Sequence, residues 1–452
     1  MRKRGTVETA LAVCLWLCVW QAASFAVDES LILVSPFAAV RTLVLMLGQA
    51  SFWHTVAFSS LRIIAGFFAA LAVGAAAAAL AARAHFVRVL LRPLMVTVRS
   101  VPVASFIILA LLWLRNAGNL AVLISFLMVL PVVYANTLEG LDHVDARLVQ
   151  MADVFGLPRA RRVRYLYIPA ALPYFRAACG VGLGLCWKSG VAAEVIGITA
   201  GSIGERLYDA KLLFSTAELF AWTLVIVLLS LGFEKLFLAA LGAAERRLLR
   251  VADGGAPAPL PGAPCAVEMR GVRVGYAGVP VLENADLSLA PGQCVCVMAP
   301  SGRGKTTLLH VLLGLVPAQA GSVTRGVRFA AAFQEDRLIA SLSALDNVRL
   351  VSGLCEAGML EAFAAVGLSA AEAKRPAAQL SGGQRRRVSL LRALLADGAS
   401  AVLLDEPFKG LDAAARDKAA AAVRRYAAGR AVLAVTHDEA DVRALGAQVY
   451  RL

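Results

Sequence analysis

Long apolar runs without any charge dominate the first half of this sequence. Residues 9–27, 63–82 and 116–138 contain no charged residue, and each has roughly the 20 residues that a helix needs to cross a bilayer. In lipid, a helix satisfies the backbone hydrogen bonds of such a run internally. Three further runs of similar length carry only a few charges. We therefore expect an all-α membrane domain over residues 1–250, with six spans at about 9–27, 60–82, 93–114, 116–138, 177–199 and 217–241.

The first run follows the basic residues Arg2, Lys3 and Arg4, so a cleaved signal peptide is an alternative to a membrane helix. Its 19 residues exceed the usual apolar segment of a signal peptide, and no small-x-small site precedes a soluble domain, so we favour a retained helix. With the N-terminus inside, 15 Lys and Arg residues up to residue 250 fall in cytoplasmic segments. Four fall outside, namely Arg41, Arg115, Arg206 and Lys211. This asymmetry predicts a multi-pass protein embedded in the lipid of the cytoplasmic (inner) membrane, with the N-terminus and the C-terminal half in the cytoplasm.

Basic residues also occur within or at the edge of the expected spans. They are Arg62, Arg99, Lys188 and Lys235. A charge inside a bilayer is costly and by default indicates function, but Lys235 can pair with its neighbour Glu234 and Arg62 lies near an interface. Lys188 lies deepest. Two interpretations of Lys188 remain: it lies on a polar translocation path, or its charge is tolerated in the membrane without a function.

The second half of the chain has a different character. Residues 251–264, rich in Ala, Gly and Pro, predict a linker, and residues 265–452 have the regular charges and short alternating strands of a soluble domain. Hydrophobic residues make up 59% of the chain, against about half in an ordinary soluble chain. We interpret this value as the average of one part that lies in lipid and one part that lies in water. The eight cysteines form no disulfide framework and no metal-binding pattern, and we interpret them as packing residues.

Residues 299–306, APSGRGKT, match the phosphate-binding pattern G-x-x-x-x-G-K-[ST] except at Ala299. An apolar strand precedes the loop and a helical run follows, which is the context that the pattern requires. In such a loop the backbone N–H groups hold the phosphates, while Lys305 adds a positive charge and Thr306 a magnesium ligand. Because these donors lie late in the loop, we expect Ala299 to cost little affinity. The expected phosphate-binding residues are Ser301, Gly302, Arg303, Gly304, Lys305, Thr306 and Thr307.

Further motifs follow in a fixed order. They are AAFQED at 331–336, LSGGQ at 380–384, AVLLDEP at 401–407, GLD at 410–412 and AVTHD at 434–438. This set resembles the Q-loop, signature, Walker B, D-loop and switch-histidine motifs of ABC ATPases, an α/β P-loop fold that binds ATP and Mg²⁺. Lys409 stands where a small residue is usual before the D-loop. The arginines of QRRRVSLLRALL at 384–395 are routine after this signature, so nucleic-acid binding is not expected.

The resemblance implies a role for each matching residue. Glu406 is expected to orient the attacking water, with His437 and Gln334 as further catalytic residues. The magnesium ligands are expected to be Thr306, Gln334 and Asp405, and Tyr276 is placed to stack on adenine. Expected to act on the ATP of a partner subunit are Ser381, Gly382, Gly383 and Gln384, together with the D-loop residue Asp412.

Residues 139–176 are too long and too charged for a simple connector, although a positive segment lying on lipid headgroups is an alternative. A break at Gly156-Leu-Pro158 predicts two short helices. The segment resembles the EAA loop of binding-protein-dependent ABC importer permeases, which docks into a cleft of the ATPase. The match includes Ala152, Asp153 and Gly156, whereas Gln150 replaces the usual glutamate. SLRIIAGF at 60–67 and GLCWKSGVAAEVIG at 184–197 further resemble the branch that serves nitrate, sulfonate and taurine.

These resemblances imply a multidomain chain. A six-helix permease domain like that of type I ABC importers would be fused to an ABC ATPase at 265–452, and the pair would import a small solute. Such a half-transporter needs a second copy or a related half, and an extracytoplasmic solute-binding protein. An exporter half-transporter is the alternative, disfavoured by the EAA-like loop. A regulatory ATPase without transport is disfavoured by the intact Lys305, Glu406 and His437. The substrate cannot be read from the sequence.

Overall fold

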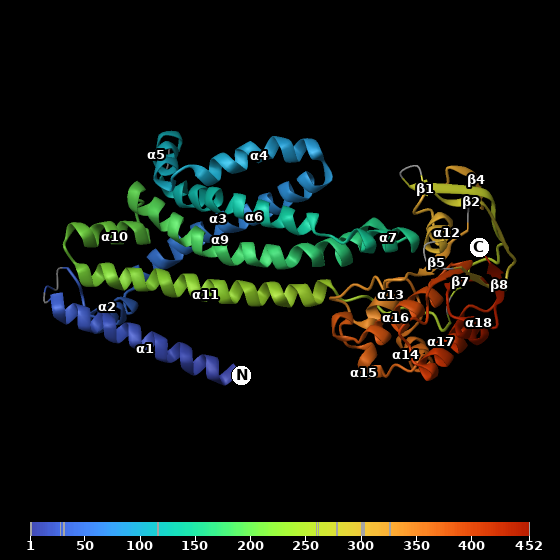
Figure 1. Cartoon of the computed structure of the whole chain (residues 1–452). Coiled ribbons are helices and arrows are strands. Elements are labelled where there is room, and N and C mark those ends of the chain that lie inside the picture. The colour runs from blue at the N-terminus through green and yellow to red at the C-terminus, as the bar shows by residue number, and fades with distance from the viewer. Residues whose placement is uncertain are drawn as a thin grey trace. The chain divides into compact units, whose positions relative to one another are not determined.

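A computed structural model describes residues 2–27, 29, 32–114, 117–258, 260, 262–276, 279–299, 303–324 and 327–451 (Figure 1). The chain forms two compact units, each made of two segments. The helical unit comprises Met1–His143 and Ala170–Glu245, and the α/β unit comprises Val144–Pro169 and Arg246–Leu452. The segment with the expected EAA-like helices therefore folds with the C-terminal half of the chain, although it lies between two membrane-type helices in sequence.

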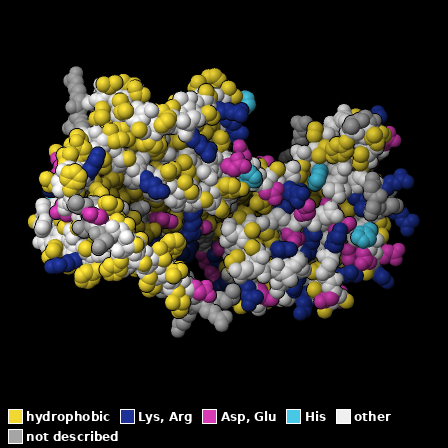
Figure 2. All heavy atoms as spheres, turned by 60° about the vertical axis from the view of Figure 1, so that its left-hand side comes forward, with side chains coloured by type: hydrophobic (Ala, Val, Ile, Leu, Met, Phe, Trp, Pro, Cys, Tyr) yellow, Lys and Arg dark blue, Asp and Glu magenta, His cyan; other side chains and the backbone are white. Residues whose placement is uncertain are grey.

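The helical unit is built almost entirely from long apolar helices. Their bounds are α1 Arg2–Val27, α2 Pro36–Leu47, α3 Ala50–Arg83, α4 His85–Ser100, α5 Val103–Trp113, α6 Leu120–Asp142, α9 Ile168–Gly197, α10 Ile203–Leu212 and α11 Thr216–Leu248. One core of this unit joins Phe67 on α3, Val129 on α6 and Trp187 on α9. Hydrophobic side chains also cover much of the outer surface of these helices, whereas charges gather on the α/β unit (Figure 2). Such a surface suits a lipid surrounding.

The count of six spans is not confirmed. Among the described residues, four helices are long and apolar enough to cross a membrane, namely Ala50–Arg83, Leu120–Asp142, Arg159–Gly197 and Thr216–Leu248. A fifth is added only if α4 and α5 are one span, but these two helices are bent by 105°. Val101 has extended backbone, with φ −76° and ψ 133°. The following Pro102 disfavours helical backbone at Val101, so the span expected at 93–114 is broken there. The expected first span corresponds to an apolar helical stretch of fewer than 18 residues, Leu11–Val27.

The α/β unit has two sheets. The antiparallel sheet has the order β2-β1-β4, and the parallel sheet has the order β5-β6-β7-β3-β8. The strands are β1 Val267–Tyr276, β2 Val279–Leu289, β3 Cys294–Met298, β4 Ala320–Val323, β5 Phe329–Ala332, β6 Ala401–Asp405, β7 Ala431–Thr436 and β8 Gln448–Arg451. Every residue of β6 and β7 is buried, because these apolar strands lie inside a sheet covered on both faces.

Helices surround the parallel sheet. They are α12 Lys305–Leu312, α13 Ala344–Arg349, α14 Glu356–Ala365, α15 Ala370–Ala373, α16 Gly382–Leu394, α17 Ala413–Tyr426 and α18 Glu439–Leu445. The same unit contains α7 Ala146–Val154, α8 Arg159–Arg162 and a π-helical turn at Val163–Tyr167. In a parallel sheet the carboxyl ends of all strands meet at one edge, which is where open α/β folds place their ligands. The loops after β3, β5, β6 and β7 carry the expected phosphate-loop, Q-loop, Walker B and switch-histidine residues.

Candidate active site

The loop after β3 is shaped for a ligand that approaches its backbone. Gly304 precedes α12 with left-handed backbone, φ 83° and ψ 11°. A Cβ atom at Gly304 would lie 2.9 Å from the carbonyl oxygen of Val281, so glycine is required there by conformation and by space. Lys305 begins α12, is only 8% exposed, and its ammonium donates to the carbonyl oxygen of Ala299. Ala299 therefore contributes a backbone oxygen, which any residue at this position would supply. Ser301 and Gly302 lie outside the described residues, and Arg303 is exposed beside the loop.

A cavity of about 370 Å³ lies over the start of α12. It brings together residues of the antiparallel sheet and of three predicted motifs that follow strands of the parallel sheet. Its lining residues are Tyr276, Val281, Gly304, Lys305, Thr306, Thr307, Gln334 and Glu406. Tyr276, at the end of β1, is half exposed, so its ring offers a free surface to a flat ligand. The cavity is thus open and polar at the phosphate loop and aromatic at one margin.

Asp405 ends β6 and is buried beside the phosphate loop. Its side chain is hydrogen-bonded to Thr306. Burial raises the pKa of Asp405 to about 6, and the negative charge of Glu406 adds to this, while the hydrogen bond from Thr306 and the charges of Arg386 and Lys409 oppose it. A hydroxyl and a buried carboxylate are hard oxygen donors of the kind that Mg²⁺ prefers. The residues therefore fit a magnesium ion, and a divalent cation would supply positive charge where the carboxylate is otherwise costly.

Glu406 follows Asp405 and is the centre of a small network. Its backbone is left-handed, with φ 45°, and its N–H donates to the carbonyl oxygen of Val435 at 2.9 Å. The Oε2 atom accepts from Gln334 Nε2 at 3.4 Å and from Lys409 Nζ at 2.8 Å. The Oε1 atom lies 3.3 Å from His437 Nδ1. The structure thus brings together three expected catalytic residues, Glu406, Gln334 and His437, from the ends of three neighbouring strands.

The environment of Glu406 keeps it ionised. Burial alone would raise the pKa of Glu406, but the hydrogen bond and charge of Lys409, followed by the charge of His437 and the hydrogen bond from Gln334, lower it below the usual value. Only 15% of its side chain is exposed. A negative carboxylate in this position can accept a hydrogen bond from water and align it. In the sequence, Lys409 is distinguished only as an unusual residue before the D-loop. Its spacing of three from Glu406 was the available signal, but only the turn geometry shows that the two side chains meet.

The signature residues lie at the beginning of α16 and do not line this cavity. Ser381 caps the helix, its Oγ accepting from the N–H of Gln384 at 3.3 Å, while Gln384 Oε1 accepts from the N–H of Ser381 at 2.8 Å. Gly382 and Gly383 form the first turn. Asp412 caps α17 in the same way, accepting from the N–H of Ala415 at 2.7 Å. Among the described residues, the cavity lining includes none of these groups.

Two buried arginines of α16 hold the loop that carries Gln334. Arg386 donates to the carbonyl oxygens of Phe333, at 2.6 Å, and of Gln334. Arg392 donates to the carbonyl oxygens of Arg337 at 2.7 Å and Asp336 at 2.9 Å. These residues act as structural donors that fix the backbone of residues 333–337. The position of Gln334 is thereby tied to the signature helix.

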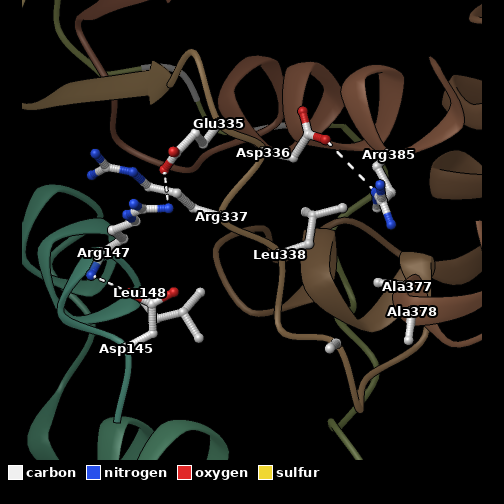
Figure 3. A pocket seen from close by; sticks show the side chains of 11 residues that line it. Asp145, Arg147, Leu148, Glu335, Asp336, Arg337, Leu338, Ala377, Ala378 and Arg385 are labelled. Atoms are coloured by element: carbon white, nitrogen blue, oxygen red, sulfur yellow. Dashed lines mark hydrogen bonds and ion pairs between the residues drawn. The ribbon is translucent and has the colours of Figure 1, made fainter. Parts of the chain in front are cut away.

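The EAA-like segment packs against the same loop. Arg147 on α7 forms an ion pair with Glu335 at 2.7 Å, and Gln150 accepts from Arg337 at 3.1 Å. A second cavity of about 370 Å³ lies here, and Figure 3 shows Arg147 and Glu335 pointing toward each other across it, with Arg337 close by. Ala152 is fully buried in the core of the α/β unit. Gln150, which stands where the EAA loop usually has a glutamate, thus accepts this hydrogen bond through a neutral amide.

The turn between α7 and α8 requires Gly156. Gly156 has φ 61°, its N–H donates to the carbonyl oxygen of Asp153 at 3.0 Å, and the N–H of Leu157 donates to that of Ala152 at 2.9 Å. This is the paired hydrogen-bond pattern of a Schellman cap, in which glycine supplies the left-handed residue. The carboxylate of Asp153 forms an ion pair with Arg162 of α8, so it locks the two short helices together.

In the helical unit, Lys188 lies exposed on α9 between buried neighbours. The buried charge of this helix is instead Glu194, which is fully buried. Its Oε2 atom accepts from the hydroxyl of Ser59 at 2.8 Å and from the N–H of Gly204 at 3.3 Å. In the sequence Glu194 is only an acidic residue within the span expected at 177–199. The structure gives it a partner on α3 and another at the start of α10.

Comparison with known proteins identifies both parts of the chain. A family model described as "ABC transporter" matches residues 282–409, and one described as "Binding-protein-dependent transport system inner membrane component" matches residues 63–250.

Curated relatives match the C-terminal part of the chain. The aliphatic sulfonates import ATP-binding protein SsuB 1 of Rhodococcus jostii (strain RHA1) is 39% identical, over 41% of this chain and 78% of its own length. SsuB 3 of Paraburkholderia xenovorans (strain LB400) is 41% identical, over 40% of this chain and 74% of its own. The taurine import ATP-binding protein TauB of Escherichia coli O157:H7 is 40% identical, over 36% of this chain and 70% of its own length. A solved dimeric bacterial ABC transporter cassette is 28% identical, covering 41% of this chain and 94% of its own, with a TM-score of 0.37.

Proposed function

This chain belongs to the ABC transporter family, and on that premise we propose that it is one fused permease–ATPase half of a binding-protein-dependent importer in the cytoplasmic membrane. Its C-terminal part is homologous to transporter subunits that hydrolyse ATP, and its N-terminal part matches a permease family. The observation that carries the proposal is the fold of Val144–Pro169 with the α/β unit. This segment links two membrane-type helices in sequence and packs on the loop that carries Gln334, so a change at the ATP site has a covalent route into the membrane helices.

Residues in and beside the cavity have different roles in ATP hydrolysis. Lys305, the backbone of the loop before α12 and the start of that helix hold the phosphates. Thr306 and Asp405 would hold Mg²⁺, which when bound offsets phosphate charge. Glu406 accepts a hydrogen bond from the attacking water and aligns it, because its carboxylate is kept negative at the edge of the cavity. His437 and Gln334 contact that carboxylate and share its hydrogen bonds.

We assign the second half of the site to another copy of this chain or to a related half. The signature residues Ser381, Gly382, Gly383 and Gln384 lie at the exposed start of α16, not at the cavity of their own chain. The N-terminus of a helix attracts phosphate, so this surface suits the ATP of a partner. A homodimer would complete both sites by the same contact, as a two-fold axis requires.

For the substrate we propose a small sulfonate-type anion, delivered by an extracytoplasmic binding protein. The relatives named above are described as ATP-binding proteins of aliphatic sulfonate import and of taurine import. An exposed ammonium at Lys188 on α9 would attract such an anion along the translocation path. The permease family match favours import over the exporter alternative, because that family is defined by dependence on a binding protein.

The test is ATP hydrolysis and uptake by the full chain in proteoliposomes with Mg²⁺. Wild-type protein is expected to hydrolyse ATP, and Glu406→Gln to bind ATP but stop turnover, with a loss of at least about a hundredfold. Glu439→Gln, which changes an acidic residue at the start of α18, is the matched control and is expected to keep its rate. Glu406→Gln turning over ATP at the wild-type rate would show that the water is aligned elsewhere. Uptake of taurine or alkanesulfonate with the matching binding protein tests the substrate.

A further inference from the structure

In the described part of the chain, three side chains contact the carboxylate of Glu406, and one of them has no role in ATP hydrolysis under the proposed function. Gln334 lines the cavity, and His437 follows the neighbouring strand β7, so both belong to the expected machinery. Lys409 does not line the cavity among its described residues. Nevertheless its ammonium makes the shortest contact with the carboxylate, 2.8 Å from Oε2. This residue therefore needs an explanation of its own.

The pair is built into a local turn. The N–H of Lys409 donates to the carbonyl oxygen of Glu406 at 3.2 Å. Further along the turn, the N–H of Leu411 donates to the carbonyl oxygen of Phe408 at 3.1 Å. Gly410 closes the turn with φ 76°. Backbone and side chain thus connect Lys409 to Glu406 without help from another element. The turn therefore places Lys409 beside Glu406 by backbone contacts that do not involve Gln334 or His437.

The contact occupies the atom that the reaction needs. A carboxylate aligns water by accepting a hydrogen bond from it, and each oxygen has about two acceptor sites. Oε2 already accepts from Lys409 and Gln334, and Oε1 lies next to His437. Other charges near the pair, namely Asp405 beside Glu406 and Arg386 beside Asp405, do not contact Oε2 in the described part of the chain.

We propose that Lys409 is a positioning residue that holds Oε2 of Glu406 away from the attacking water and thereby restrains ATP turnover. The inference rests on the proposed function of the cavity as an ATP hydrolase. The pair opens readily, because the side chain of Lys409 is 54% exposed and water screens its charge. Turnover then requires opening of the pair, so that an idle transporter wastes less ATP.

Kinetics of the full chain in proteoliposomes test the restraint. Lys409→Met is expected to raise kcat roughly threefold or more, while KM for ATP changes by less than about twofold, because the contact is with the water-aligning group and not with the phosphate loop. Lys409→Arg keeps a cation at this position and is expected to stay near the wild-type rate. Lys418→Met removes an exposed lysine of α17 and controls for loss of charge. An unchanged or lower kcat for Lys409→Met would overturn the inference.

A second measurement does not depend on activity. The rate at which an amine-reactive acylating reagent modifies Lys409 without nucleotide is quantified by peptide mass spectrometry, with Lys418 as internal reference. The ion pair is expected to slow this reaction, so Glu406→Gln should accelerate modification of Lys409 and leave Lys418 unchanged. Equal rates in both proteins would show that the pair does not form. If instead wild-type protein fails to hydrolyse ATP, the proposed function is wrong, and the labelling result still reports on the pair.

Discussion

Arg337 donates to the side-chain oxygen of Gln150 at 3.1 Å, although the two residues are 187 positions apart in sequence. The guanidinium of Arg337 also lies over the ring of Phe333, 3.8 Å from its centroid, and its carbonyl oxygen is held by Arg392. The hydrogen bond therefore joins α7 to a loop that is fixed at both ends. We expect a displacement of Gln334 when nucleotide binds to reach α7 through the contacts of Arg337 and Glu335 with this helix.

Replacing Gln150 tests this transmission. Gln150→Ala removes the acceptor of Arg337, so stimulation of ATP turnover by binding protein and substrate is expected to fall severalfold while ATP binding is kept. Gln150→Glu is expected to retain stimulation, because a carboxylate accepts the same hydrogen bond with added charge. Arg159→Ala, which alters an exposed residue of α8, is the control. Full stimulation of Gln150→Ala would mean that this contact does not carry the signal.

Cross-linking tests whether α7 docks at this loop in the membrane. The ion pair of Arg147 with Glu335, at 2.7 Å, is the best-placed site, since Asp153 is engaged with Arg162 instead. In a background without the eight native cysteines, Arg147→Cys with Glu335→Cys is expected to be joined by a short thiol-specific cross-linker. The negative control combines Arg147→Cys with Asp417→Cys, which lies on α17. No joined product in either nucleotide-free or ATP-trapped protein would contradict the docking.

The cap at Gly156 predicts a sensitive position. Gly156→Val places a β-branched residue at φ 61°, which costs about 1–2 kcal/mol and loosens the turn between α7 and α8. Transport is expected to fall while ATP binding by the α/β unit survives. Gly156→Asn is expected to be milder, because asparagine tolerates left-handed backbone. Equal transport by the valine and glycine proteins would show that the turn does not need this conformation.

ATP binding is expected to be insensitive to a substitution at Ala299, the first position of the phosphate loop. Ala299 receives the ammonium of Lys305 on its carbonyl oxygen, so Ala299→Gly keeps the contact and only frees the backbone. ATP affinity is expected to change by less than tenfold, which corresponds to about 1.4 kcal/mol. Equilibrium binding of a fluorescent ATP analogue measures this, with Lys305→Met as the variant that should bind far more weakly. A tenfold gain for Ala299→Gly would indicate that the alanine impairs the loop.

The site residues that could be predicted from the sequence are those that lie close to one another along the chain. Gly304, Lys305 and Thr306 lie on one turn, and Asp405 and Glu406 lie at the end of one strand and directly after it, so a local motif is enough to place them together. The meeting of Glu406 with His437, by contrast, depends on β6 and β7 being adjacent parallel strands, and the motifs do not contain this adjacency. The roles assigned to these residues remain predictions, as do those of the signature residues and of Lys188.

What could not be derived depends on contacts distant in sequence or on backbone angles. Arg337 carries no motif, and its partner on α7 emerges only when the segment Val144–Pro169 joins the α/β unit. The break of the expected third span was signalled by Pro102, but hydropathy averages over a window and does not register a bend of 105°. The ion pair of Lys409 with Glu406 depends on a left-handed residue at Glu406, which no propensity favours.

The strand order β5-β6-β7-β3-β8 has a consequence for how such a chain tolerates changes in length. Each of four strands delivers one piece of the site from its carboxyl end, and one residue of strand spans about 3.3 Å. A single inserted residue near the end of β6 or β7 would therefore move Glu406 or His437 out of reach and turn the following side chains to the opposite face. Insertions at the amino ends of the same strands would be absorbed by loops far from the cavity. In natural variants, loop length should consequently vary at one edge of this sheet and stay constant at the other.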